Sequence, residues 1–204
     1  MEEMWNKRYA NKAYAYGTDP NKFFKDSIQR YALSGDLLLP AEGEGRNAVY
    51  AAMHGFNVTA FDISIEGKKK ALALANKHKV SIQYEVGLLP ELNLNNEQFD
   101  AAALIFAHFP VPLLSDYHNR IANLIKPEGY IILEGFSKSH LPLREANPAV
   151  GGPNNLEMLF SKVGIEKDFP RFEVLELTET EVTLDEGEFH QGTGSVIRFI
   201  GKKR

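Results

Sequence analysis

The chain has 204 residues, of which 44% are hydrophobic, and its formal net charge at pH 7 is −4. This length and apolar content suit one folded domain with a substantial core, and the negative charge excludes a basic protein drawn to nucleic acid or anionic membranes. There is no cysteine, which excludes disulfides, thiolate metal sites and a cysteine nucleophile.

No apolar run is long enough to cross a bilayer, and the charged, aromatic first ten residues are unlike a signal peptide. We therefore expect a cytoplasmic protein, monomeric or weakly dimeric. We predict a small-molecule ligand, no nucleic-acid or membrane partner and no metal site. The expected organisation is one domain over 1–204, with a helical cap or lid at 1–32 and a core at 33–204.

The N-terminal segment is polar and rich in aromatic residues. Trp5 and Tyr9 are four residues apart and would share one helix face, residues 16–21 have the composition of a turn, and 23–32 predict a short helix. One interpretation is a cap whose rings pack on the core. Another is a lid whose aromatic faces attract a bound cation by roughly 0.5–2 kcal/mol. The two are compatible.

Residues 36–64 predict the unit around which the rest is organised. An apolar strand at 37–39 leads into a glycine-rich turn, then a helix that stops at Gly55, then a second strand at 58–61 that ends at Asp62. Strand, turn, helix and strand with an acid at the tip form the layout of a nucleotide-binding Rossmann-type half.

The residue types in this unit indicate the kind of ligand. Gly43 and Gly45 allow a tight turn and close approach of a ligand to the backbone, and the Asp62 carboxylate can accept both hydroxyls of a ribose. Glu42 and Glu44 would repel a pyrophosphate but suit a positively charged amino-acid group. S-adenosylmethionine has a ribose, an ammonium and a sulfonium but no phosphate, and the segment resembles the first motif of the Rossmann-like S-adenosylmethionine-dependent methyltransferases.

The middle of the chain alternates between helices and strands. We expect a helix at 64–79 with Ser64 as its N-cap, a strand at 81–86, an apolar strand at 99–106, a helix at 112–125 and, after a tight turn at 127–129, a strand at 130–136. Gly87 stands where such methyltransferases often carry an acid for adenine, which leaves the Leu88 amide as the expected donor. His108 follows a strand end, where ligands bind in open parallel sheets.

The last third of the chain begins with a polar stretch at 137–155, which predicts a long loop, either covering the substrate or disordered. Within it, Arg144 is the side chain most able to grip an anion. A short helix at 161–169 and strands at 172–184 and 195–201 follow. The two closing strands predict an antiparallel hairpin at the end of an α/β chain.

Six stretches spread over nearly the whole chain carry a common pattern: 5–9, 16–21, 42–47, Asp62, 108–110 and 186–198. Together they resemble the small methyltransferases related to the tellurite-resistance and thiopurine S-methyltransferases. The resemblance implies a Rossmann-like, doubly wound, mostly parallel seven-stranded sheet, S-adenosyl-L-methionine as cofactor and S-adenosyl-L-homocysteine as product. The cofactor-binding residues expected are Trp5, Arg8, Tyr16, Glu42, Gly43, Gly45, Asn47, Asp62, Ile63, Leu88 and Ala107.

The predicted reaction is in-line displacement of a methyl group by a small-molecule acceptor. A soft acceptor such as a thiolate or a reduced metalloid needs no general base, whereas an oxygen or nitrogen acceptor could use His108 or His190, the candidate catalytic residues. Two other hypotheses stay open. One is an NAD(P)-dependent oxidoreductase, and the other is a non-catalytic protein that binds S-adenosylmethionine.

Overall fold

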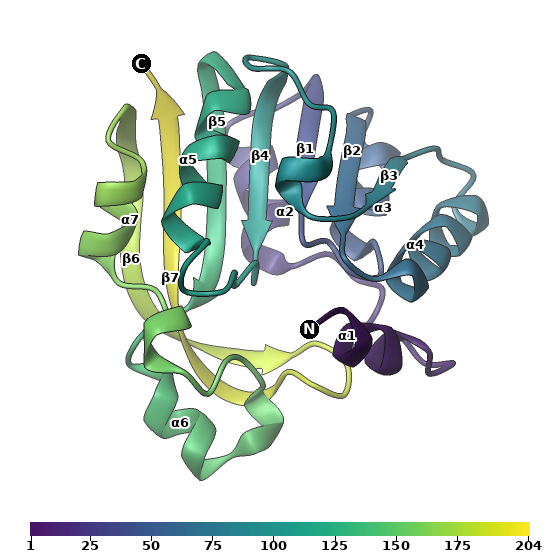
Figure 1. Ribbon diagram of the computed structural model, residues 1–204, viewed down its shortest axis with the longest axis vertical. Coiled ribbons are helices and arrows are strands. Elements are labelled where there is room, and N and C mark those ends of the chain that lie inside the picture. The colour runs from purple at the N-terminus through teal and green to yellow at the C-terminus, as the bar shows by residue number, and fades with distance from the viewer.

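The computed structural model describes residues 1–204 and is built around a seven-stranded sheet with the order β3-β2-β1-β4-β5-β7-β6 (Figure 1). The first five strands run parallel, and β7 runs antiparallel to both β5 and β6. This confirms the predicted doubly wound α/β fold with a C-terminal antiparallel hairpin. The strands are β1 (Asp36–Pro40), β2 (Asn57–Asp62), β3 (Gln83–Val86), β4 (Phe99–Ile105), β5 (Ile125–Phe136), β6 (Phe172–Asp185) and β7 (Gln191–Lys203).

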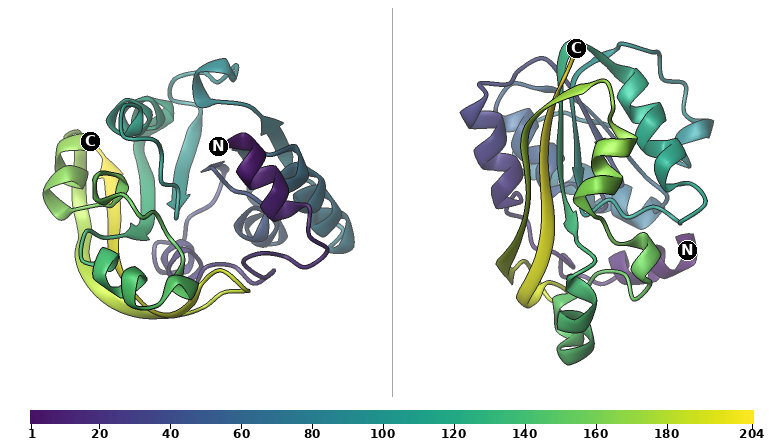
Figure 2. Two further views of the ribbon diagram at one scale, coloured as in Figure 1. Left: turned by 60° about the horizontal axis from the view of Figure 1, so that its bottom comes forward. Right: turned by 90° about the vertical axis from the view of Figure 1, so that its left-hand side faces the viewer.

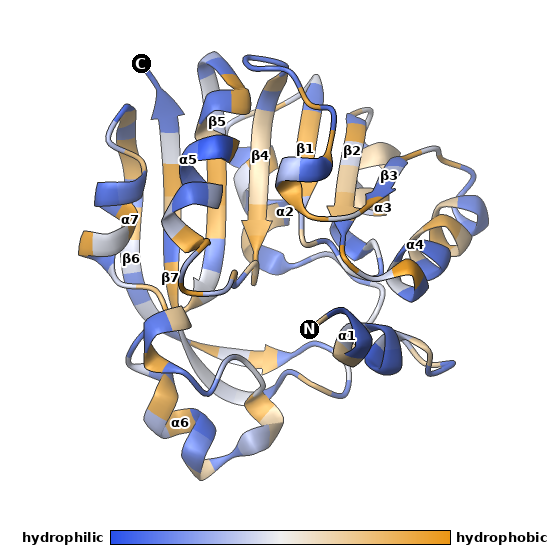
Figure 3. Ribbon diagram, viewed as in Figure 1, coloured by the Kyte–Doolittle hydropathy of each residue, from blue (hydrophilic) through white to orange (hydrophobic).

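Helices cover both faces of the sheet (Figures 1 and 2). One face packs against α2 (Lys22–Arg30), α3 (Arg46–Met53) and α4 (Ile65–Lys77), and the other against α5 (Leu114–Leu124) and α7 (Lys162–Asp168). β1 shows why both faces are buried: Leu37 and Leu39 join the first cluster and Leu38 joins the second, because side chains alternate across a strand. The central strands are accordingly apolar, whereas the helices carry the polar outer surface (Figure 3).

Two helices lie beyond the carboxyl ends of the parallel strands instead of on a sheet face (Figure 1). They are α1 (Glu2–Tyr9) and α6 (His140–Ala146), and Figure 2 shows them on the same end of the sheet. None of the helices combines the length and apolar character that a bilayer span requires.

The largest differences from the predicted boundaries are in three places. β5 starts at Ile125, so residues 127–129 are an irregularity inside the strand, opposite a register shift in β4, and not a turn before it. Residues 137–155 are not one irregular loop, because they contain α6 and the short 3-10 turn Pro148–Val150. β7 begins at Gln191, directly after His190, because its pairing with β6 continues to Asp185.

Candidate active site

A cavity of about 730 Å³ opens at the carboxyl ends of β1, β2 and β4, which is where open parallel sheets bind ligands. Its walls come from α1, the turn after β1, the ends of β2 and β4, the loop at 152–158 and the tip of the β6–β7 hairpin. Ten of the thirteen predicted site residues line it: Trp5, Arg8, Tyr16, Glu42, Asn47, Asp62, Ile63, Leu88, His108 and His190. Gly43, Gly45 and Ala107 do not line this cavity.

The two glycines of the turn are required by packing against the protein itself. Gly43 and Gly45 have φ values of +62° and +85°, and a Cβ on Gly43 would lie 2.6 Å from the Tyr9 hydroxyl oxygen. A Cβ on Gly45 would lie 2.5 Å from the Cβ of Ala71 in α4. The expectation that both glycines leave room for a ligand is therefore wrong in its reason, since α1 and α4 occupy that space.

Glu42 is buried and caps the following helix. Its Oε1 accepts hydrogen bonds from the backbone N–H groups of Asn47 and Ala48 at 2.8 and 2.7 Å, and its Oε2 accepts one from the Asn47 side chain at 3.3 Å. The helix needs this cap because its N-cap residue, Gly45, has no side chain. Burial raises the pKa of Glu42 to about 7, against the opposing effect of these bonds.

Glu44 does not contribute the free negative charge that the sequence suggested. Its carboxylate pairs with Lys70 Nζ at 2.5 Å and accepts the N–H of Ala15 at 2.7 Å. Lys70 also donates to the carbonyl oxygens of Asn11 and Ala13, at 2.8 and 2.6 Å. Glu44 thus holds the N-terminal segment in place and has no free charge that would repel a phosphate.

Asp62 closes β2 and faces the cavity. Its Oδ2 accepts the N–H of Gly43 at 3.1 Å and its Oδ1 accepts the N–H of Ser64 at 2.9 Å, so the carboxylate ties the glycine turn to the start of α4. Burial raises its pKa to about 6. A carboxylate oxygen can accept more than one hydrogen bond, so each oxygen can also accept one from a ligand hydroxyl.

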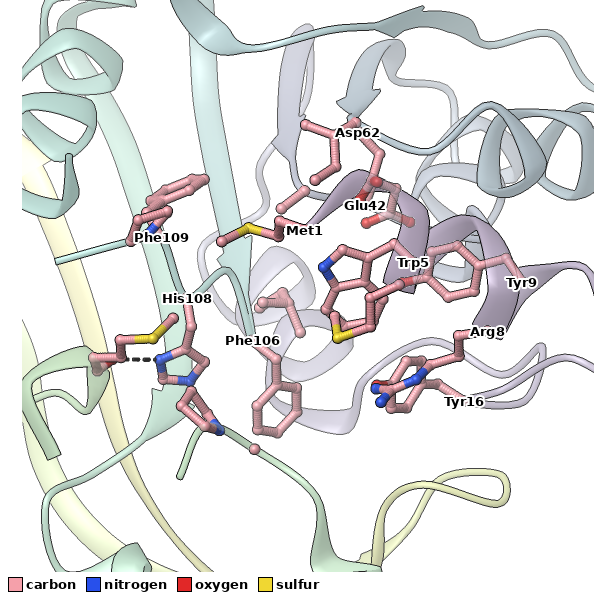
Figure 4. Close-up of a pocket in the computed structure, with 18 of the residues that line it drawn as sticks. Met1, Trp5, Arg8, Tyr9, Tyr16, Glu42, Asp62, Phe106, His108 and Phe109 are labelled. Atoms are coloured by element: carbon pink, nitrogen blue, oxygen red, sulfur yellow. Dashed lines mark hydrogen bonds between the residues drawn. The ribbon is translucent and has the colours of Figure 1, made fainter. Parts of the chain in front are cut away.

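The N-terminal helix covers this end of the cavity (Figure 4). Asn6 anchors it, because its Oδ1 accepts a hydrogen bond from Ser64 Oγ at 2.7 Å. Trp5 stacks on Tyr9 with ring centroids 5.3 Å apart. The Arg8 guanidinium lies 4.8 Å from the Trp5 ring and donates to the Tyr16 hydroxyl at 2.7 Å, yet no carboxylate pairs with it. The cavity therefore contains an arginine whose charge is free to meet an anion.

At the adenine end the expected donor is already bonded. The N–H of Leu88 donates to Glu91 Oε2 at 2.9 Å, within a short 3-10 turn at Leu89–Glu91. The prediction that this amide contacts adenine is therefore wrong for this conformation. Leu88 is 44% exposed and lines the cavity, as Ile63 does, so both residues contribute apolar surface.

His108 connects the loop after β4 to two other segments by hydrogen bonds at both of its ring nitrogens, so it is not a free base. One ring nitrogen, Nδ1, lies 2.8 Å from the carbonyl oxygen of Met158, and the other, Nε2, accepts the N–H of Phe136 at 3.0 Å. The ring also stacks on Phe160 with centroids 4.4 Å apart. Burial lowers its pKa to about 4. Because both nitrogens hold backbone groups, the structure contradicts its assignment as a general base.

His190 has a different environment at the tip of the β6–β7 hairpin. Its Nδ1 lies 2.9 Å from Glu186 Oε2, and its ring packs against Tyr16 and Phe106 at 4.5 and 4.6 Å between centroids. It is 4% exposed and lines the cavity, and no protein group bonds to its Nε2. Burial lowers its pKa, while Glu186 acts in the opposite direction.

Sequence reasoning did not assign a role to the residues that hold this histidine. Arg46 Nη2 pairs with Glu186 Oε2 at 3.0 Å, and Asn21 Nδ2 donates to Glu186 Oε1 at 3.3 Å. Although burial alone would raise it, contacts with His190 and Arg46 lower the pKa of Glu186 to about 2. Asn21 does not line the cavity. Its Nδ2 also donates to Glu134 Oε1 at 2.7 Å, which links the hairpin tip to β5.

Comparison with known proteins relates the middle of the chain to one family. Residues 40–129 match the family model described as the methyltransferase domain. The ubiquinone biosynthesis O-methyltransferases of two Rickettsia bellii strains are 28% identical over 97 residues, which is 48% of this chain. The match spans about 40% of the length of these curated relatives.

Several solved structures share the fold. A protein studied for the conversion of a disulfide bond into a thioacetal group during echinomycin biosynthesis superposes with a TM-score of 0.77 at 17% identity, covering 100% of this chain and 91% of that one. TehB from Haemophilus influenzae gives 0.69 at 16%, covering 100% and 67%. Magnesium protoporphyrin IX methyltransferase from Synechocystis with bound SAH gives 0.66 at 17%, covering 89% and 80%.

Two findings define the class that this chain resembles: residues 40–129 match the methyltransferase-domain model, and the fold is shared with a solved structure described as a SAM-dependent methyltransferase. S-adenosylmethionine is the cofactor of this class. The residues of the cavity fit it, since Asp62 has acceptor capacity for hydroxyls, Arg8 has an unpaired charge for a carboxylate, and Trp5 presents an aromatic face.

Proposed function

We propose that this protein transfers a methyl group from S-adenosylmethionine to a small-molecule acceptor such as a thiol, a metalloid or a similar compound. The observation that supports this most strongly is the continuity of the cavity, which extends from Asp62 and Glu42 to His190. When bound, S-adenosylmethionine supplies an activated methyl group. The protein would hold donor and acceptor in line, and such positioning can lower a barrier by roughly 7–11 kcal/mol.

Each wall of the cavity has a proposed role. The Asp62 carboxylate would accept the ribose hydroxyls, and Ile63 and Leu88 would flank the adenine. Arg8 would pair with the cofactor carboxylate, because it has no acidic partner in the protein. Glu42 would attract the ammonium group. Its role is mainly long-range, since its oxygens already bind the start of α3.

Within the N-terminal segment, residues 1–32, α1 would act as a lid on this site, whereas α2 packs in the core and would stay in place. Trp5 lies over the cavity, and a sulfonium near an aromatic face gains roughly 0.5–2 kcal/mol. α1 contacts the core through side chains, namely Asn6, which bonds to Ser64, and Tyr9, which is buried, so it could detach without breaking any strand pairing. Opening of this lid would admit the cofactor.

Two similarities bear on the acceptor. The shared fold with TehB, together with the motifs of the sequence, favours the tellurite-resistance and thiopurine S-methyltransferase subgroup. The curated relatives, by contrast, are named as O-methyltransferases. The acceptor atom is therefore the first property to measure.

Titration calorimetry tests the cofactor assignment. We expect S-adenosylmethionine and S-adenosylhomocysteine to bind and NADH not to bind. Asp62→Ala should weaken binding by about tenfold or more, because it removes a buried acceptor at the ligand. Asp26→Ala, a surface carboxylate paired with Lys22, is the matched control and should bind as the wild type does. Binding of NADH alone would favour the oxidoreductase hypothesis.

A radiolabelled-methyl screen tests catalysis. The full chain is incubated with labelled S-adenosylmethionine and small thiols, tellurite, selenite, phenols, amines and cell extract. Label transfer to any of these supports the enzyme. Tight cofactor binding without transfer to any member of the panel would favour the non-catalytic hypothesis.

A further inference from the structure

Glu186 and His190 form a buried dyad with one free end. Glu186 sits in the turn between β6 and β7, four residues before His190, and its Oε2 lies 2.9 Å from His190 Nδ1. The His190 side chain is 5% exposed and the Glu186 side chain 18%. The other ring nitrogen, Nε2, has no protein partner, and the residue lines the cavity.

The carboxylate is held from two other elements. Arg46, from α3, pairs with it at 3.0 Å, and Asn21, at the N-cap of α2, donates to its second oxygen at 3.3 Å. A charged pair of this kind keeps Glu186 ionised and fixed in position. An ionised carboxylate can only accept a hydrogen bond, so His190 must present a proton at Nδ1. In the neutral ring, Nε2 then carries the lone pair.

The second histidine at the cavity gives an internal comparison. Both nitrogens of His108 bind backbone groups, so its ring has no free lone pair toward the cavity. A buried imidazole with an ionised partner on one nitrogen and a free lone pair on the other has the arrangement of a general base. Of the two candidate histidines, only His190 has it.

We propose that Glu186 is a positioning residue that orients His190 as the general base, and that the acceptor is therefore a molecule whose nucleophile gives up its proton too weakly at neutral pH to react without a base, namely a hydroxyl or an amine. This rests on the proposed methyl transfer. A thiolate or a reduced metalloid already has an available electron pair and needs no base. The presence of an oriented general base therefore favours a hydroxyl or an amine as the acceptor.

The acceptor's O–H or N–H bond breaks and its proton moves to His190 Nε2. The electron pair of that oxygen or nitrogen forms the bond to the methyl carbon. The bond from that carbon to the cofactor sulfur breaks, and its electron pair stays on the sulfur, which becomes neutral. The protonated His190 is stabilised by Glu186 and then loses its proton to solvent.

The charge environment of His190 determines the pH dependence. Six ionisable groups face His190 or influence its charge, and they come from several elements. They are Glu186 of its own hairpin, Arg8 of α1, Tyr16 of the loop after α1, Arg46 of α3, His108 of the loop after β4 and His140 of α6. The rate should rise with pH as His190 loses its proton. Removing the negative charge of Glu186 should move this rise to lower pH, because Glu186 favours the protonated ring.

The test compares His190→Gln and Glu186→Gln with the wild type in the full chain. Each is given labelled S-adenosylmethionine and a panel of acceptors that contains phenols, amines, thiols and selenite. We expect a hydroxyl or amine acceptor to give the highest kcat/KM. His190→Gln should lower kcat by about 10²–10⁴. Glu186→Gln should also lower kcat and move the acidic limb to lower pH. Binding of S-adenosylhomocysteine, followed by the fluorescence of Trp5, the single tryptophan, should not change.

The buried pair of His118 and Asp168 is the matched control. Its Nδ1–Oδ2 distance is 2.7 Å, and neither residue lines the cavity. Asp168→Asn removes the same kind of interaction between α5 and α7, so it should lower stability without moving the pH–rate profile. If Glu186→Gln lowers stability but, like Asp168→Asn, leaves the pH–rate profile unmoved, the Glu186 pair is only structural.

Two results overturn the inference. One is transfer to thiols or selenite alone. The other is a pH–rate profile of His190→Gln that matches the wild type. If the variants fail to fold, ¹⁵N shifts of the His190 ring in the wild type decide, since a proton on Nε2 at neutral pH contradicts the assigned tautomer. Absence of S-adenosylhomocysteine binding in the wild type would instead refute the proposed function itself.

Discussion

Substituting alanine for Gly45 tests whether the glycine turn is shaped by the approach of α4. A Cβ at this position would meet the Cβ and Cα of Ala71 at 2.5 and 2.8 Å. Gly55, at the end of α3, has a closely similar φ of +88° against +85°, but no atom lies within 4 Å of its Cβ position. The two glycines therefore share the backbone cost of alanine and differ only in the steric cost.

The magnitudes follow from these distances. A left-handed conformation costs an L-residue roughly 1–2 kcal/mol, which is the whole expected effect of Gly55→Ala. Gly45→Ala should add about 1–3 kcal/mol for overpacking, because the opposing atoms belong to a helix backbone and a short rigid side chain. In a domain of this length each kcal/mol lowers Tm by roughly 2–4 °C.

Urea denaturation and thermal melts of both variants measure the difference, and the double variant Gly45→Ala with Ala71→Gly measures its cause. Removing the Ala71 methyl group should give a favourable coupling of about 0.5–3 kcal/mol with Gly45→Ala. If Gly45→Ala is no more destabilising than Gly55→Ala, the turn has room above it. The close approach of α4 would then not be the reason for glycine.

Three further outcomes follow from the bonded groups around the cavity. Burial raises the pKa of Glu42 from 4.5 to about 7, so the folded state binds the extra proton and stability falls as pH rises through this window; in denaturation at several pH values, Glu42→Gln should remove that part of the decline. Lys70→Met should expose residues 10–16 to limited proteolysis, whereas Lys69→Met, which loses only a surface pair with Glu66, should not. His108→Leu leaves two backbone groups without hydrogen-bond partners, so it should lower the free energy of unfolding, measured by chemical denaturation, by about 1–3 kcal/mol for each group. A variant as stable as the wild type would show that His108 does not hold these loops together.

Periodicity and turn chemistry were sufficient to predict most of the fold. The alternation of Leu37, Leu38 and Leu39 between two faces is a local property, and Ser64 caps α4 through its own side chain. The start of β5 could not be predicted in this way. Pro127 and Gly129 have turn composition, yet pairing with β4 keeps them within the strand, because tertiary hydrogen bonding overrides local preference.

The residues that line the site were more predictable than their roles. The position of Asp62 at a strand end is enough to place it at the cavity. Whether a charge there is free depends on partners far away in the chain. Glu44 is neutralised by Lys70, and His108 binds Met158, fifty residues later. No motif or spacing records such pairings, so sequence reasoning overestimated the free charge of the turn.

The same bonds hold both the N-terminal segment and the proposed base. Arg46 donates to the Tyr16 carbonyl oxygen at 3.2 Å and also pairs with Glu186, while Asn21 joins Glu186 to the first turn of α2. Moving residues 10–21 away from the cavity would therefore remove Asn21 from the carboxylate that orients His190, and would remove the Tyr16 carbonyl oxygen from Arg46. The cover over the cavity and the orientation of the histidine are coupled because they depend on shared side chains, and a base in its active orientation requires the N-terminal segment to be in place.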